Sequence, residues 1–494
     1  MKTWVPMALF IAFFTANGEG HAAALTDFTV GEPDCLVMNR FPKPNERIKW
    51  SGGCKNGYAE GQGTLEWFEG DKATSRFEGS MVAGVPDGIG LYTFLDNGVS
   101  YSGGFKAGKR HGQGTATLPG GQVQKGWFEN DELVGEVEVT GPGMFRYVGG
   151  WVKGRPHGKG LHHSQDGVIY EGEFKAGLPE GQGTVTLING QTISGHFEKG
   201  NVVGVARLVG PGRYRYHGGL LYGRPHGEGE IVYTDEATYK GTFKNGLRDG
   251  LGFASFPDGS KFDGTWIADK PEGRGTLTHA NGSVYEGEVS DGLPHGMGKS
   301  RSPLGLLMEG TWRAGRLDGE GRITQPNGAT YTGTLVAGTL DGRGVLRLPD
   351  GSEYAGEFKS DKRHGTGVLI DADGTRREGT WVADQLEGQG TEVSRDGRRY
   401  VGGWHLNRPN GAGTLEFDGH RMRGQWNDGV MNGPASIEFD DGAQAHGNFL
   451  RGQFNGNWTL TSPSGEKTVI EYELGKPKLP NSRLPALRLS DRAI

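Results

Sequence analysis

A pattern of glycines and aromatic residues returns along this chain every 23 residues. One copy, residues 170–192, reads YEGEFKAGLPEGQGTVTLINGQT, and its Gly172 serves here as the reference glycine of the unit. From Gly103 to Gly402 this glycine returns in thirteen successive steps of 23 residues without insertion or deletion, and looser copies reach Gly52 and Gly447. A fixed short period over such a length is the signature of a tandem repeat array.

Each repeat has the residue alternation of a β-hairpin. Tyr170, Gly172 and Phe174 alternate with charged residues, and a second piece, 184–187, alternates threonine with aliphatic residues. Asn-Gly or Asp-Gly pairs end five residues before many reference glycines and favour type I′ turns. We therefore expect one hairpin per repeat with such turns, and a glycine-rich return into the next hairpin. The 92 glycines of 494 residues hold fixed places, which argues against disorder.

The pattern resembles the MORN repeat (membrane occupation and recognition nexus), with its Tyr-x-Gly-x-Phe/Trp-x-x-Gly-x-x-x-Gly-x-Gly consensus. The match extends from Trp50 to Trp458 and includes eighteen copies. The resemblance implies an all-β fold, an elongated single-layer antiparallel sheet of about 18 tandem 23-residue β-hairpins. It also implies a scaffold, a dimerisation rod or a docking surface, and a role at lipid head groups is ascribed to the family.

Some repeats depart from the consensus. Val137 and Ala206 replace the last glycine of their repeats, and Leu220, Val289 and Leu335 replace the second aromatic residue. We expect these departures to change the local curvature or the aromatic face, so that the repeats do not offer one uniform binding surface.

The pattern divides the chain into five segments. These are a signal peptide (1–24), an N-terminal cap (25–49), the repeat array (50–458), a C-terminal capping strand (459–474) and a basic tail (475–494). The cap and the final strand are expected to cover the ends of the array. The tail is rich in proline and basic residues and is interpreted as flexible, with a docking peptide as the alternative.

The first 24 residues have the features of a secretory signal. Lys2 precedes an apolar run of ten residues, Val5–Phe14, which is too short to span a bilayer, and small residues end at Ala24. We expect cleavage after Ala24. The mature chain is then periplasmic or on the cell surface of a bacterium, with a eukaryotic secretory route as the alternative.

The chain has two cysteines, Cys35 in the cap and Cys54 in the first repeat. In an exported protein the simplest interpretation is one disulfide that fixes the cap to the array. Two free, buried thiols are the alternative.

We expect no enzymatic activity, cofactor or metal site. No segment outside the repeats is long enough for a catalytic domain, and no nucleophile elbow, HExxH or CxxC pairing occurs. Five histidines lie eight residues after a reference glycine: His111, His157, His226, His295 and His364. Because a hairpin advances a sheet by about 10 Å, these histidines lie too far apart to share a metal ion.

The aromatic stripe is the candidate binding face, with packing of the sheet's own core as the alternative for most of its rings. Its tyrosines and tryptophans are Tyr101, Tyr147, Tyr170, Tyr216, Tyr239, Tyr285, Tyr331, Tyr354, Tyr400, Trp151, Trp266, Trp312, Trp381 and Trp404.

Two hypotheses of function follow. The first is a non-catalytic exported scaffold or protein–protein interaction rod, whose partner is an envelope protein or a second copy of the chain in a homodimer. The second is a binding module that contacts lipid head groups or cell-wall glycan through the aromatic face. The net charge of −6 disfavours anionic lipid and, together with export, excludes nucleic acid.

Overall fold

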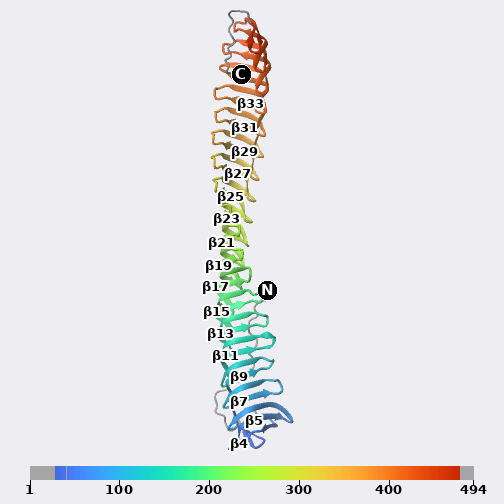
Figure 1. The fold of residues 1–494 in the computed structure, drawn as a ribbon, viewed down its shortest axis with the longest axis vertical. Helices are drawn as coiled ribbons and strands as arrows, with labels where there is room; N and C mark the ends of the chain where they lie inside the picture. Colours follow the sequence, from blue (N-terminus) through green and yellow to red (C-terminus); the bar gives the residue numbers. More distant parts are fainter. Residues whose placement is uncertain (1–27, 40–41, 479–494) are drawn as a thin grey trace. The chain divides into compact units, whose positions relative to one another are not determined.

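The protein is built from β-strands throughout the part of the chain that the computed structural model describes, residues 28–39 and 42–478 (Figure 1). Those residues contain strands β1 to β41 and one short 3-10 turn, η2 (Pro142–Met144). The predicted all-β fold of tandem antiparallel hairpins is therefore confirmed. No helix within these ranges has the length and apolar character needed to cross a membrane. The predicted signal peptide and the end of the basic tail lie outside the described residues.

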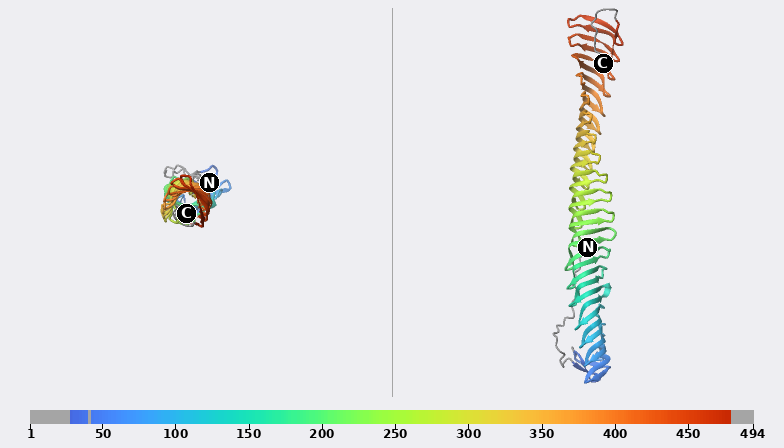
Figure 2. Two further views of the ribbon diagram at one scale, coloured as in Figure 1. Left: turned by 90° about the horizontal axis from the view of Figure 1, so that it is seen from above. Right: turned by 60° about the vertical axis from the view of Figure 1, so that its left-hand side comes forward.

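The chain forms two compact units, Met1–Gly250 and Leu251–Ile494, with the boundary inside strand β21 (Leu247–Ser255). In each unit the hairpins follow one another in chain order (Figures 1 and 2). The strands of the first unit are β1 (Phe28–Gly31), β2 (Cys35–Met38), β3 (Glu46–Trp50), β4 (Gly53–Lys55), β5 (Tyr58–Glu69), β6 (Lys72–Val82), β7 (Val85–Phe94), β8 (Ser100–Lys106), β9 (Lys109–Thr117), β10 (Val123–Glu129), β11 (Glu132–Thr140), β12 (Arg146–Val152), β13 (Arg155–His163), β14 (Ile169–Lys175), β15 (Leu178–Thr186), β16 (Thr192–Glu198), β17 (Asn201–Gly210), β18 (Tyr214–Leu221), β19 (Arg224–Tyr233) and β20 (Thr238–Lys244).

The second unit continues the same alternation to the end of the described chain. Its strands are β22 (Lys261–Ile267), β23 (Lys270–Thr278), β24 (Val284–Ser290), β25 (Leu293–Arg301), β26 (Leu307–Arg313), β27 (Arg316–Thr324), β28 (Thr330–Val336), β29 (Thr339–Arg347), β30 (Glu353–Lys359), β31 (Lys362–Ile370), β32 (Arg376–Val382), β33 (Gln385–Val393), β34 (Arg399–His405), β35 (Arg408–Phe417), β36 (His420–Asn427), β37 (Val430–Glu438), β38 (Gln444–Leu450), β39 (Gln453–Thr461), β40 (Lys467–Glu473) and β41 (Lys476–Pro477).

Both ends of the array carry extra strands. At the N-terminal end β1 pairs with β2, β3 pairs antiparallel with β5, and β2 meets β5 in parallel at Leu36 and Tyr58. At the other end β40 pairs with β39, and β41 adds two more residues to the sheet. Strand pairing therefore reaches Pro477, the third residue of the segment interpreted as a flexible tail.

The turns differ from the sequence-based expectation. The two-residue turn of the hairpin falls at Ala176 and Gly177, both with positive φ, between β14 and β15. At Asn189 and Gly190 only the glycine has positive φ, and the amide of Leu187 donates to the carbonyl of Gln191 across a longer loop. The expected type I′ turn at the Asn-Gly pair was therefore wrong. The glycine-rich return is not a loop either, because Gly181 and Gly183 lie within β15.

In most strands of the array one glycine lines up with a glycine of the neighbouring strand. In β14 and β15 Gly172 pairs with Gly183, and the next strand continues the row with Gly195. Just beyond this row the register shifts between Gly172 and Phe174, which marks a β-bulge in the hairpin. A Cβ atom on Gly172 would lie 2.6 Å from the phenol oxygen of Tyr170, so the ring requires bare backbone beneath it.

Candidate functional site

The fourteen rings of the predicted binding face are packed inside the protein. Each is at most 8% exposed. The face that carries them, called the inner face below, is therefore core in this structure, and a partner cannot contact the rings without displacing them. The sequence analysis gave packing in the sheet's own core as the alternative for most of these rings, and the rings lie in that core.

The rings bury one another because most tyrosines of the stripe touch an aromatic residue of the next repeat, and several also touch one of their own repeat. The ring of Tyr170 lies 5.0 Å, centroid to centroid, from that of Phe174 and 5.1 Å from that of Phe197, edge to face in both cases. Tyr354 makes the same two contacts with Phe358 and Trp381 in the second unit. Such edge-to-face pairs add about 0.5–1.5 kcal/mol to the burial of their area.

The polar atoms of these rings are bonded to the backbone. All nine tyrosines of the stripe donate from the phenol oxygen to the carbonyl three residues later, at 2.7–3.0 Å. Burial raises the pKa of Tyr170 to about 12, because the phenolate would lose its water. The indole N–H groups of Trp266, Trp312 and Trp381 donate to the last glycine carbonyl of the preceding repeat at 3.0–3.1 Å.

Where a repeat lacks its tyrosine, a neighbouring side chain fills the space. Arg377 stands at the tyrosine position of its repeat. A Cβ atom on Gly390 would lie 2.9 Å from Cδ1 of Trp404, which shows that the next repeat's indole covers this glycine instead. The indole nitrogens of Trp404 and Trp426 have no hydrogen-bond partner among the described residues. The sequence pattern alone did not indicate this substitution.

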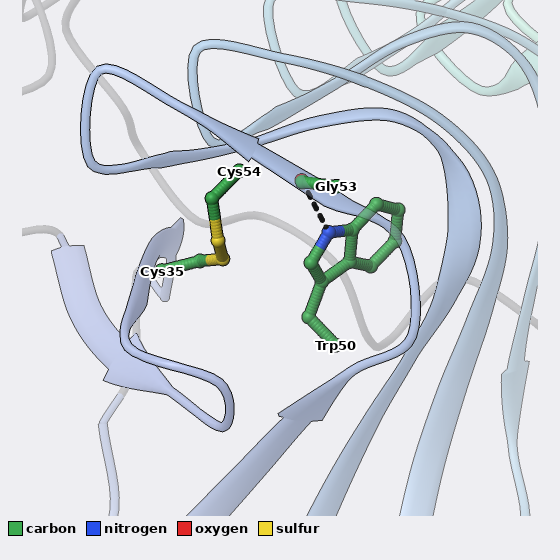
Figure 3. Close-up of a disulfide and its surroundings, with 4 residues drawn as sticks. All are labelled: Cys35, Trp50, Gly53 and Cys54. Atoms are coloured by element: carbon green, nitrogen blue, oxygen red, sulfur yellow. Dashed lines mark hydrogen bonds between the residues drawn. A yellow bond between two sulfur atoms is a disulfide. The ribbon is translucent and has the colours of Figure 1, made fainter.

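The two cysteines are joined in a disulfide, the pairing expected from the sequence (Figure 3). Their Cα atoms lie 5.8 Å apart, and nineteen positions separate them in the chain. Beside the bridge the indole N–H of Trp50 donates to the carbonyl of Gly53 at 2.9 Å. The bridge connects β2 of the cap to β4 before the first long strand, and thus fixes the cap to the array.

The position that carries the five histidines has a structural role that the sequence interpretation missed. Glu180, at this position, accepts a hydrogen bond from the turn amide of Lys199 in the next hairpin at 2.9 Å. His226 accepts the equivalent bond from the amide of Asn245 through Nδ1 at 3.4 Å. Eight residues after the reference glycine, the repeats often have Asp, Glu, Asn or His, whose side chains can all accept a hydrogen bond. This preference could have indicated the role from the sequence. No group of three His, Cys, Asp or Glu residues in the described chain is arranged to hold a metal ion.

The opposite, outer face of the hairpins remains open to partners. The glycine row forms the floor of two grooves there, of about 440 and about 700 Å³. The first is flanked by Arg274, Glu286 and Lys299, and the second by Thr414, Arg423 and other polar side chains. The backbone amides and carbonyls of these strands pair with one another in the sheet, so the polar side chains that flank the grooves are the groups that can form hydrogen bonds with a ligand.

Comparison with known proteins identifies the repeat. The model of the MORN repeat family matches fifteen segments: residues 50–72, 77–99, 101–123, 147–169, 170–192, 216–238, 239–261, 262–284, 285–303, 309–330, 331–353, 354–376, 378–398, 400–419 and 423–444. A search of curated protein sequences found no significant match.

Two of the solved structures that match this chain are domains of animal proteins. The TCP10 domain of Danio rerio CPAP, in complex with a peptide of STIL, is 17% identical, with a TM-score of 0.24 over 46% of this chain and 97% of that chain. The TCP domain of Drosophila melanogaster dCPAP, in complex with a proline-rich motif of Ana2, is 16% identical, with a TM-score of 0.21 over 30% of this chain and 82% of that chain. Likenesses at this level carry no information on what this chain binds.

Proposed function

Because this chain belongs to the MORN repeat family, a family of repeat-based interaction scaffolds, we propose that it is a non-catalytic, exported scaffold. Its partner is an envelope protein that docks on the outer face of the hairpins. The proposal rests on the distribution of side chains between the two faces. The aromatic residues of the stripe are buried in the core, and the outer face is available for binding.

One part of the outer face is suited to a protein partner. In β28 to β31 the residues Thr332, Val345, Ala355 and Val368 are successive cross-strand partners and form a row beside the glycines, called the central strip below. The three apolar members are half-buried by their neighbours and expose small side chains. A flat strip of small apolar side chains within a polar face is a feature of protein-docking surfaces, since it buries area without leaving charges unpaired.

The burial of the aromatic rings also argues against the second hypothesis, a lipid or glycan module that uses the aromatic face. Rings that are at most 8% exposed present little surface to a head group or a sugar. The net acidic chain also disfavours anionic membranes. Export is supported by the signal-like N-terminus and by the Cys35–Cys54 disulfide, which persists in oxidising compartments.

Site-specific photocrosslinking in the native envelope tests the proposal. A photoreactive phenylalanine analogue replaces Ala355 on the central strip in one variant and Leu335 in the other, and the tagged mature protein is recovered after irradiation. Leu335 is the matched control because it belongs to the same unit but lies in the core, 1% exposed. We expect a reproducible protein adduct from position 355 and none from position 335.

The other outcomes separate the alternatives. An adduct of two copies of this chain at position 355 would identify the strip as a self-association surface, and the envelope partner would be wrong. Enrichment of lipid or glycan without a protein adduct would favour the second hypothesis. Equal crosslinking at both positions would show that the adducts do not report a defined surface.

A further inference from the structure

Trp127 is the exception among the described tryptophans of the first unit, residues 28–39 and 42–250. Its side chain is 47% exposed on the outer face of β10, whereas Trp50, Trp67 and Trp151 are at most 8% exposed. It stands one residue after its reference glycine. Other repeats have small or polar residues there, including Ser80, Gly104, Gly150, Glu173, Thr242 and Thr265. An indole at this place contributes nothing to the aromatic core on the inner face, so the core does not explain it.

The positions that flank Trp127 along the sheet carry no side chains. Its cross-strand neighbours are Gln113 on β9 and Val134 on β11. The equivalent positions in the preceding and following repeats are Gly104 and Gly150, which have no side chain. Because each repeat contributes two strands, these glycines lie about 10 Å to either side of the indole. The carbonyl oxygens of His111 and His157 fill the space that a Cβ atom would occupy there, so these positions offer bare backbone rather than a gap.

Polar side chains frame the indole. Gln113 and Glu136 are exposed, and Glu136 lies on β11 opposite Gly150. The ring of His111 meets the indole edge to face at 6.4 Å, and its Nδ1 atom has no hydrogen-bond partner in the part of the chain that the structure describes. Amide, carboxylate and imidazole groups together supply both donors and acceptors around one aromatic surface.

The charges around the site favour an uncharged ligand. The hairpin of β10 and β11 carries five acidic residues and one lysine. In the hairpins on both sides, all the charged residues are basic. They include Lys106 and Lys109 on one side and Arg146 and Lys159 on the other. A strongly cationic ligand would meet the flanking bases, and a strongly anionic one would meet the acids. Charge selection is therefore weak, and hydrogen bonding and stacking decide the binding.

We propose that Trp127, with Gln113 and Glu136, forms a binding platform for a neutral polysaccharide. The apolar face of a pyranose ring lies on the indole, which combines a large apolar surface with an electron-rich face. The sugar hydroxyls donate to the carboxylate of Glu136 and exchange hydrogen bonds with the amide of Gln113. The sugars that precede and follow lie along the sheet over Gly104 and Gly150, where no side chain stands in their way. The site goes beyond the scaffold function and does not depend on the central strip.

Titration of the purified mature protein with neutral hexasaccharides tests this site. Chitohexaose, cellohexaose and maltohexaose are added separately, and binding is followed by calorimetry and by the protection of tryptophan fluorescence from acrylamide quenching. We expect saturable binding of at least one saccharide, weakened about tenfold or more by Trp127→Thr. Threonine occupies this position in several other repeats, so the variant retains a residue that the fold accepts.

Two further variants keep the test decisive. Gln113→Ala removes one polar group from an exposed position and is expected to weaken binding while leaving the circular dichroism spectrum unchanged. Tyr222→Lys is the control, because it removes a different aromatic side chain that is 94% exposed. A lysine, Lys153, occupies the same position in a related repeat, so the fold accepts it and binding should stay unchanged. The proposal is overturned if no hexasaccharide saturates the wild-type protein, if Trp127→Thr binds equally well, or if a hexalysine peptide binds at Trp127 and the saccharides do not.

Discussion

The phenol of Tyr170 donates a hydrogen bond to the carbonyl of Glu173, three residues later in the same strand, at 3.0 Å. The acceptor lies where the pairing register shifts between Gly172 and Phe174. The side chain thus fixes the backbone at the bulge of its own hairpin while its ring covers the glycine pair. Eight other tyrosines repeat this bond, so the sheet is held by a local contact that each repeat makes for itself.

Replacing Tyr170 by phenylalanine should weaken its repeat measurably. The variant keeps the ring but removes the donor of a part-buried hydrogen bond, which costs about 1 kcal/mol. Hydrogen exchange of residues 170–192 should therefore become about fivefold faster in the amides that open locally. The matched control is Tyr222→Phe, because the Tyr222 phenol is in water and should leave exchange unchanged. Equal effects of the two variants would contradict a role for the bond.

Gly183→Ala should destabilise the same repeat more strongly. A Cβ atom at Gly183 would overlap the phenol of Tyr170, and overpacking of this kind costs about 1–3 kcal/mol. In the next repeat, Ala206 takes the place of this glycine and Ile193 takes the place of the tyrosine. The smaller aliphatic side chain there leaves room for the alanine. The double variant Tyr170→Ile with Gly183→Ala should therefore be more stable in urea than Gly183→Ala alone. A double variant no better than the single one would show that ring and glycine are not coupled.

The fold should be lost at alkaline pH. Burial raises the pKa of Tyr147, Tyr216 and Tyr400 to about 12. Because the folded pKa lies above the unfolded value of about 10, the neutral phenols stabilise the fold fully below pH 10, and this contribution disappears as the pH rises toward 12. Most of the phenolate absorbance at about 295 nm should appear together with the loss of the strand signal in circular dichroism. Formation of most of the phenolate near pH 10 with the strand signal intact would contradict the burial of these rings.

Removal of the disulfide should release the cap and spare the array. In the double variant Cys35→Ser with Cys54→Ser, a crosslink across a separation of 19 residues is lost, which costs about 3 kcal/mol. Amide exchange should speed up in β1, β2 and β4. Residues 170–192 should be unaffected, since each repeat depends chiefly on its neighbours. Unchanged protection of the cap would mean that β3 and β5 hold it without the bridge.

The sequence carried strong information on the fold because a repeat multiplies a weak local signal. The spacing of Gly172 and its equivalents predicted the tandem hairpins, and the two cysteines predicted the pair that is joined. The position of the turn was missed because positive φ at Ala176 is not a preference of alanine. It is imposed by the pairing of β14 with β15, and local turn propensities did not indicate it.

The candidate site was less accessible to sequence reasoning. Alternation of residues showed that Tyr170 and Phe174 share a face, because successive side chains point to opposite sides of a strand. It could not show that rings of successive repeats bury one another, since that depends on the bulge and on bare glycine backbone under each ring. The sequence by itself determined the period, the hairpins and the two faces. Only the tertiary structure decided which face is core and that Trp127 lies on the open one, because burial is a property of contacts between repeats.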